Sequence, residues 1–240
     1  MIKTEKILTN IKTQEYRVDK TFFEQGKPAI SALLQLFQDI ATEQLEELKL
    51  NYLYLEKQGK TWVILQNAIK LFSLPKLGEK LLLKTILYAP NVVDCDREYF
   101  LINEQGQTLI YGFSKWCLID VQTRKITSYQ NVLFPIQCKP KQEKGYKLVA
   151  FQPNDDNFLF AYQVTQNDID FNNHMNNVAY GKLVLKALQN HNMNLCEFVI
   201  NYQKECHKDD WLKIHLEQQE KLIEIVGTKN NQICFVCALK

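Results

Sequence analysis

The chain has 240 residues, of which 46% are hydrophobic and 23% charged, so it can bury a core as one large domain or as two smaller ones. Its 29 Lys and Arg against 27 Asp and Glu give a formal net charge of +2. That balance is too small to favour nucleic acid or an anionic membrane surface as a partner.

Cysteine usage and the absence of long apolar runs predict a compartment. The seven cysteines have no framework spacing, which favours free thiols in a reducing environment over a disulfide scaffold. No apolar run reaches the roughly 18 residues that a bilayer requires, and the opening residues lack the apolar core of a signal peptide. We therefore expect a cytoplasmic protein without a membrane partner.

The first half of the chain predicts a helix followed by a sheet. Residues 13–24 indicate an opening strand, and residues 27–48 switch to a helical period, with Pro28 suited to the first turn. The predicted helix has one broad apolar face, made by Ile30, Leu33, Leu34, Phe37, Ile40, Ala41, Leu45 and Leu48. Four strand-like segments joined by short turns follow, at residues 61–72, 79–89, 95–103 and 107–120. This order predicts a curved antiparallel sheet around a central helix.

The second half repeats that order. Residues 123–147 are charged, contain prolines and lack periodicity, which is typical of a linker. A predicted strand at 158–166 then leads through a polar loop to a helix at 177–189. Strand-like segments follow at residues 195–205, 210–219, 221–229 and 232–240. We expect an α+β fold with two copies of one architecture, an N-terminal domain over residues 1–140 and a C-terminal domain over 141–240.

The polar loop, NDIDFNNHMNNVAY, is the strongest candidate site. Asp170, Asn172 and His174 are spaced i, i+2, i+4, which on an extended loop aims their side chains the same way. They combine a base, a hydrogen-bond donor and an imidazole ahead of a helix. The backbone N–H groups of Asn176, Asn177 and Val178 add positive potential for a developing oxyanion.

A simpler explanation of the loop stays open, because Asn and Asp are also ordinary cap residues. We interpret Asn167 and Asp168 as turn and capping residues. Cys234 and Cys237 form a C-x-x-C, but they lie in a predicted strand, which argues against a redox or metal pair.

The two halves differ in chemistry. All four histidines, His174, His191, His207 and His215, fall in the second half. The first-half loop before its helix, FFEQGKP, offers only the carboxylate of Glu24. A reaction that needs an imidazole is therefore expected in the second half, with the first half supplying pocket and partner surface. His191 and His215 lack acidic or amide companions and are interpreted as surface or packing residues.

The polar loop resembles the D-x-D-x-N-x-H-x-N-N-x-x-Y segment of acyl-acyl carrier protein thioesterases. Three further segments resemble this family in the expected order: TWVILQNAIKLFSLPKLGEKLLLKTILYAP, KWCLIDVQTRKI and NYQKECHKDD. The resemblance spans nearly the whole chain, implies two tandem hotdog domains, and suggests a bacterial member because no plastid transit peptide precedes the match. Relatives often have Trp and Glu after the tyrosine, where this chain has Leu183 and Lys186, which leaves the shape of the acyl pocket open.

The resemblance also implies a catalytic set, namely Asp170, Asn172, His174 and Glu205, with Cys206 kept as an alternative. Neighbouring strand residues point to opposite faces, so only one of Glu205 and Cys206 can face the loop, and we favour Glu205. The implied reaction is hydrolysis of acyl-carrier-protein thioesters without a metal or organic cofactor. Whether Asp170 activates water or attacks directly to form an anhydride stays open.

The implied partner is an acyl carrier protein. Because carrier proteins are acidic, Lys204, Lys208 and Lys213, together with His207, form a candidate docking patch, although scattered surface charge would look the same. Two other hypotheses stay open: an acyl-CoA thioesterase, disfavoured by the lack of a Gly-rich phosphate loop, and a non-catalytic acyl-binding hotdog protein. The sequence does not decide chain-length preference or whether the protein is a monomer or a homodimer.

Overall fold

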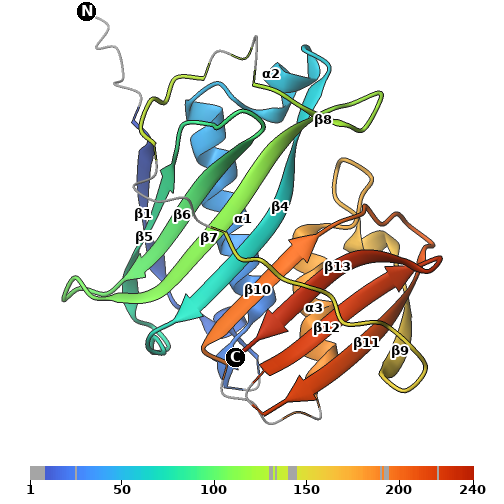
Figure 1. Cartoon of the computed structure of the whole chain (residues 1–240). Helices are drawn as coiled ribbons and strands as arrows, with labels where there is room; N and C mark the ends of the chain where they lie inside the picture. The colour runs from blue at the N-terminus through green and yellow to red at the C-terminus, as the bar shows by residue number, and fades with distance from the viewer. Residues whose placement is uncertain are drawn as a thin grey trace, which may run out of the picture.

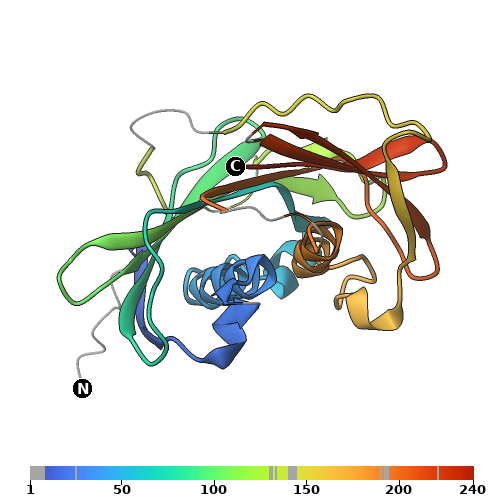
Figure 2. The ribbon, with the colours of Figure 1, turned by 90° about the horizontal axis from the view of Figure 1, so that it is seen from below.

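Two helices lie side by side within the curve of a large antiparallel sheet (Figures 1 and 2). They are α1 (Ile30–Glu47) and α3 (Asn177–Ala187), and both predicted apolar faces are buried. This computed structural model describes residues 9–24, 26–129, 132, 134–139, 145–189, 191, 195–220 and 222–240.

The first half supplies one long helix and most of the longer strands. Its strands in the main sheet are β1 (Ile11–Arg17), β4 (Lys60–Leu71), β5 (Lys80–Leu87), β6 (Asp94–Ile102), β7 (Thr108–Asp120) and β8 (Ile126–Thr127). The minor elements are η1 (Lys20–Phe22), β2 (Phe23–Glu24), β3 (Lys27–Pro28) and α2 (Tyr52–Glu56).

Two boundaries of the first half differ from the prediction. The opening strand ends at Arg17, because the Asp19 side chain accepts the N–H of Thr21 at 2.8 Å and starts a 3-10 turn. Pro28 pairs with Phe23 in β3, so α1 begins after it at Ile30 and not with the proline in its first turn.

The second half repeats the pattern with β9 (Phe158–Gln163), η2 (Gln166–Asp168), β10 (Glu197–Tyr202), β11 (Trp211–Gln219), β12 (Leu222–Lys229) and β13 (Gln232–Leu239). Cys234 and Cys237 lie within β13 as buried free thiols. Two strands of this half end earlier than predicted. β9 stops at Gln163, because the segment predicted as its end leads into the 3-10 turn η2. β10 ends at Tyr202, because the backbone N–H groups of Gln203 and Lys204 both donate to the carbonyl of Cys234. Residues 203–210 therefore form a loop, and this loop carries Glu205.

The two halves share one sheet. Among the described residues the pairing order is β1-β5-β6-β7-β4-β10-β13-β12-β11-β9, with β8 beside β7. The junction is the antiparallel pair β4 and β10, from Glu197 opposite Lys70 to Asn201 opposite Gln66. Below the junction α1 packs on α3, and Gly181 permits this approach because a Cβ there would lie 3.2 Å from the Ser31 backbone. A rigid junction of this kind fixes residues of one half relative to the other.

Residues 145–157 cross the convex face of the sheet without regular structure (Figure 2). The Tyr146 N–H donates to Gln66 Oε1 at 2.8 Å, and Tyr146 packs with Leu148 near a small cluster of Ala68, Phe113 and Val199. The linker predicted at 123–147 therefore continues to 157 and covers β4, β7 and β10. Residues 130–131, 133 and 140–144 of that linker lie outside the described residues.

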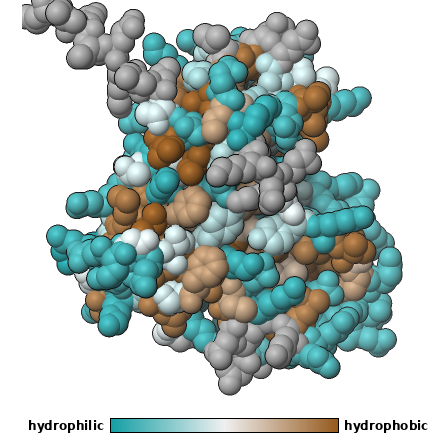
Figure 3. All heavy atoms as spheres, turned by 60° about the vertical axis from the view of Figure 1, so that its left-hand side comes forward, coloured by the Kyte–Doolittle hydropathy of each residue, from teal (hydrophilic) through white to brown (hydrophobic). Residues whose placement is uncertain are grey.

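Figure 3 shows the face around β1 and β5, where hydrophobic side chains appear in several separate groups among hydrophilic ones. Ile11 and Leu82 are among the exposed apolar residues of these strands. Within the described ranges, no helix is long and apolar enough to cross a membrane.

Candidate active site

The polar loop begins with a capping box around Asp168. Its carboxylate accepts the N–H and the hydroxyl of Thr165, both at 2.8 Å, and the hydroxyl of Tyr162 at 2.8 Å. Burial, together with this hydrogen bond, raises the pKa of Tyr162 to about 12. The interpretation of Asp168 as a capping residue is confirmed, and Asn167 beside it is exposed in the same turn.

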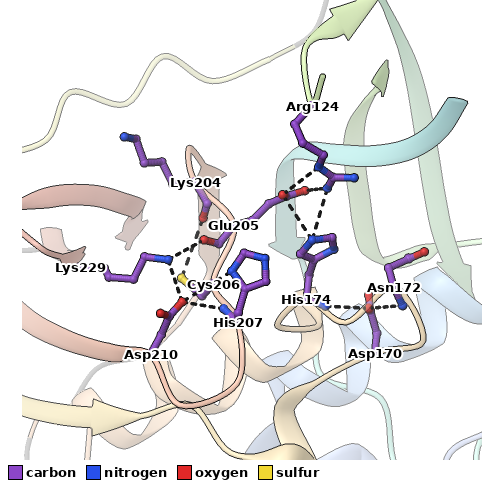
Figure 4. A network of polar contacts seen from close by, with 10 residues as sticks. All are labelled: Arg124, Asp170, Asn172, His174, Lys204, Glu205, Cys206, His207, Asp210 and Lys229. Carbon is purple, nitrogen blue, oxygen red and sulfur yellow. Dashed lines mark hydrogen bonds and ion pairs between the residues drawn. The ribbon is translucent and has the colours of Figure 1, made fainter. Parts of the chain in front are cut away.

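Asp170 closes the next turn of the loop. Its Oδ1 accepts the N–H of Asn172 at 2.8 Å and that of His174 at 3.4 Å, while its own N–H donates to the His174 carbonyl at 2.9 Å (Figure 4). Asn173 takes a left-handed conformation, φ 62°, to complete the turn. Oδ2 of Asp170 has no hydrogen-bond partner among the described residues, so one carboxylate oxygen holds the loop and the other is available for chemistry.

His174 meets Glu205, as the sequence predicts. The His174 Nε2 lies 3.4 Å from Glu205 Oε2, and both side chains are partly exposed. Burial lowers the pKa of His174 from 6.5, and the charges of Arg124 and His207 lower it further, against the opposing effect of Glu205 and Asp170. The imidazole is therefore neutral near pH 7 and can accept a proton.

Glu205 and Cys206 occupy a loop, although the sequence predicts a strand there. They still point apart: Glu205 faces His174, while Cys206 is fully buried with its Sγ 3.9 Å from the Lys204 carbonyl (Figure 4). The Cys206 carbonyl accepts the N–H of Met175 at 2.7 Å, which fastens this loop to the polar loop. Hydrogen bonds from Cys234 and Tyr180 lower the pKa of the Cys206 thiol. Its burial nevertheless separates it from the open side of the site, so the geometry favours Glu205 over Cys206.

Arg124 is a site residue that the sequence analysis misses. It follows β7 in the first half, and its Nε donates to Glu205 Oε2 at 3.2 Å while its Nη2 contacts Glu205 Oε1 (Figure 4). The same Nη2 lies 3.4 Å from His174 Nε2. The segment KWCLIDVQTRKI contains Arg124, but a turn arginine has no local signature that shows which distant carboxylate it meets.

A second polar network supports the Glu205 loop from the other side. Lys229 Nζ donates to the Glu205 carbonyl at 3.1 Å and pairs with Asp210 at 2.7 Å. Asp210 also accepts the N–H of His207 at 2.7 Å, and the His207 ring packs against the His174 ring with centroids 4.9 Å apart. The loop is thus held on both flanks.

One possible use of this cluster is metal binding, because ligand atoms of His174, Glu205 and His207 all lie within 4.8 Å of one another. Arg124 already binds both Glu205 oxygens, however, and its positive charge opposes a cation at the same place. We therefore assign no metal centre to it.

The helix N-terminus differs from expectation in one respect. The Asn176 N–H donates to the Asp168 carbonyl at 2.8 Å, and the Val178 N–H donates to Asn176 Oδ1 at 3.0 Å. Asn176 is thus the N-cap of α3, and the prediction of the Asn176 and Val178 N–H groups as oxyanion donors is wrong in this structure. Within the described part of the chain, the Asn177 N–H has no partner and stays available.

Comparison with protein families identifies the chain. Residues 9–133 match the acyl-ACP thioesterase N-terminal domain, and residues 151–234 match the acyl-ACP thioesterase C-terminal domain. The chain belongs to this family. Among curated proteins, it is 23% identical over 221 residues to an acyl-[acyl-carrier-protein] hydrolase of Cuphea viscosissima, covering 85% of this chain and 52% of that protein. An oleoyl-acyl carrier protein thioesterase of Arabidopsis thaliana is 18% identical over 222 residues, covering 83% and 59%. The chain spans about half the length of these curated relatives.

Solved structures of acyl-ACP thioesterases confirm the predicted fold. A Bacteroides thetaiotaomicron acyl-ACP thioesterase superposes with a TM-score of 0.81 at 20% identity, covering 96% of this chain and 97% of that one. The 12:0-ACP thioesterase from Umbellularia californica gives a TM-score of 0.85 at 14% identity, covering 96% of each chain. Two tandem hotdog domains in an α+β fold are therefore the architecture of this thioesterase-family chain.

The lysines predicted to dock a carrier protein are exposed but do not form one cluster with shared contacts. Lys204 and Lys208 lie in the Glu205 loop, where Lys204 contacts the Gln232 side chain. Lys213 lies in β11. For this thioesterase-family protein, the docking role of these lysines stays a prediction.

Proposed function

We propose that this chain hydrolyses the thioester of acyl-acyl carrier protein and releases a free fatty acid, which terminates chain elongation. The observation that carries the proposal is the contact of His174 with Glu205 beside the Asp170 turn, in a chain whose two halves both match the acyl-ACP thioesterase family. Acyl carrier protein is the proposed partner. The acyl pocket in the first half and the domain division at residue 140 remain part of this proposal.

Asp170 has two roles open to it. As a general base, its free Oδ2 takes a proton from water, and the resulting hydroxide attacks the thioester carbonyl carbon. As a nucleophile, Oδ2 attacks that carbon itself, the C–S bond breaks, and water then hydrolyses the mixed anhydride. Both routes need a fixed carboxylate, which the two N–H bonds to Oδ1 support.

His174 and the amides complete the proposed mechanism. In the general-base route, the imidazole passes the proton that Asp170 takes from water to the departing thiolate. In the nucleophilic route, the neutral imidazole accepts a proton from the water that hydrolyses the anhydride, and that proton neutralises the thiolate released in the first step. Glu205 acts through His174, as a positioning residue that orients the ring. The side chain of Asn172 and the N–H of Asn177 would stabilise the tetrahedral oxyanion, because α3 begins at this point. No step in this scheme requires a metal or an organic cofactor.

The proposal is tested by steady-state hydrolysis of acyl-carrier-protein and acyl-CoA esters with the same chains, from short to long. We expect higher kcat/KM on the carrier-bound series. The His174→Gln variant, prepared identically, controls for contaminating thioesterases. Preference for acyl-CoA would favour the second hypothesis, and binding of acyl chains without turnover would favour the non-catalytic one.

A further inference from the structure

Arg124 extends from the first half to the proposed catalytic side chains of the second. Its turn is built without its side chain: Asp120 Oδ1 accepts the N–H of Thr123 at 2.7 Å and that of Gln122 at 3.1 Å. The Arg124 N–H in turn donates to the Asp120 carbonyl at 2.9 Å. The guanidinium is therefore presented by a preformed turn at the end of β7 and is not needed to form it.

The target of the guanidinium is held just as independently. Lys229 fixes the Glu205 carbonyl at 3.1 Å, and Met175 fixes the carbonyl of Cys206 at 2.7 Å. Because β4 and β10 join the halves in one sheet, the distance between the turn and the loop is set by the fold. Arg124 and Glu205 therefore contact each other from two backbone segments that are each held in place by other hydrogen bonds.

The Arg124 guanidinium, the Glu205 carboxylate and the His174 Nε2 atom form one cluster of contacts. Arg124 binds both Glu205 oxygens, which is the bidentate geometry that arginine favours with carboxylates. His174 Nε2 lies 3.4 Å from Glu205 Oε2 and 3.4 Å from Arg124 Nη2. A carboxylate favours a proton on that nitrogen and a guanidinium disfavours it, so the pair together sets the protonation of the ring.

We propose that Arg124 is a positioning residue that pins Glu205 beside His174 and keeps the imidazole unprotonated before the reaction. The inference rests on the proposed hydrolysis, and it gives the first half of the chain a direct part in the active site. A carboxylate alone would hold a proton on His174, and the ring would then enter the reaction as an imidazolium that cannot accept one.

The other charged groups around His174 fit this role. Glu205 and Asp170 raise the pKa of His174, while burial, Arg124 and His207 lower it, and the net result is a lowered pKa. Removing Arg124 deletes a nearby positive charge and also frees the full charge of Glu205. Both changes raise the pKa of His174, so the direction of the effect is the same for either cause.

Three variants test the inference. Arg124→Met removes the charge, and Arg124→Lys keeps a charge without the bidentate contact to Glu205. Lys125→Met is the matched control, since Lys125 is exposed in the same turn. In Arg124→Met we expect kcat to fall by up to about 100-fold, the loss that a misplacement of about 1 Å can cause. KM should change less, and the acid limb of the pH–rate profile should move to higher pH. Arg124→Lys should recover part of kcat, and Lys125→Met should match wild type.

A titration of the His174 ring by NMR makes the test independent of turnover. The inference predicts that the His174 pKa rises in Arg124→Met and not in Lys125→Met, whether or not any thioester is a substrate. An unchanged His174 pKa in Arg124→Met would overturn it. Wild-type inactivity on every thioester, with the predicted titration intact, would instead contradict the proposed function alone.

Discussion

The Asp168→Ala variant tests how the polar loop is held. Asp168 is 7% exposed and accepts three hydrogen bonds, from the Thr165 N–H, the Thr165 hydroxyl and the Tyr162 hydroxyl. Thr165 is exposed, so its N–H and hydroxyl can bind water once Asp168 is removed. The cost of losing these two bonds is therefore that of losing a helix cap, about 1–2 kcal/mol of unfolding free energy. The half-buried Tyr162 hydroxyl also loses its acceptor, which costs about 1 kcal/mol of unfolding free energy. The free energy of unfolding should therefore fall by about 2–3 kcal/mol.

Denaturant unfolding followed by circular dichroism measures this change, with Asn167→Ala as the control because Asn167 is exposed beside Asp168. The control should stay within about 0.5 kcal/mol of wild type. Asp168→Asn, which keeps one acceptor oxygen, should fall between wild type and Asp168→Ala. If Asp168→Ala is as stable as Asn167→Ala, the capping box does not hold the loop and the reasoning is refuted.

Four further predictions follow from the contacts. Cys206→Ala should keep kcat within a few fold of wild type, because the thiol faces the core; loss of turnover in a variant that still folds would restore Cys206 as a catalytic candidate. Gly227→Ala should lower the melting temperature, since its Cβ would lie 2.0 Å from the Phe235 ring, whereas Gly106→Ala, with open space around it but φ 78°, should cost only turn strain. Lys208→Glu should raise KM for acyl-carrier protein in a salt-dependent way and leave acyl-CoA unaffected if the docking prediction holds. Because the pKa values of His174 and His215 are lowered by folding, the unfolded chain binds more protons just below pH 6.5; stability should fall as pH drops through that range, less steeply in His215→Gln.

The sequence predicts the elements well because their signals are local. The apolar period from Ile30 to Leu45 and the alternating strands both survive packing, and all eight predicted face residues of α1 and its end are buried. The boundaries are less predictable. β10 ends at Tyr202 because the next two N–H groups both donate to one carbonyl of β13, and this depends on tertiary pairing that the local sequence does not encode.

In the site too, residues with local sequence signals are predictable and residues defined by tertiary contacts are not. Asp170, Asn172 and His174 are close in sequence, and Glu205 came from the family resemblance, so all four could be named. Arg124 could not, because its role depends on a turn of the first half that lies 81 residues before the carboxylate it binds. The sequence assigns the Asn176 and Val178 N–H groups wrongly because capping and oxyanion binding compete for the same donors. Only the geometry shows that the Asp168 carbonyl and the Asn176 side chain accept them.

Hydrolysis of one acyl-carrier-protein substrate by wild type, Asp170→Asn and Asp170→Ala tests the central claim most directly. Asn keeps an oxygen for the N–H groups of Asn172 and His174, so it preserves the turn while removing the carboxylate. The account predicts that kcat falls by about 100-fold or more in both variants. Full turnover by Asp170→Asn, with loss only in Asp170→Ala, would contradict it and show that Asp170 shapes the loop and takes no part in the chemistry.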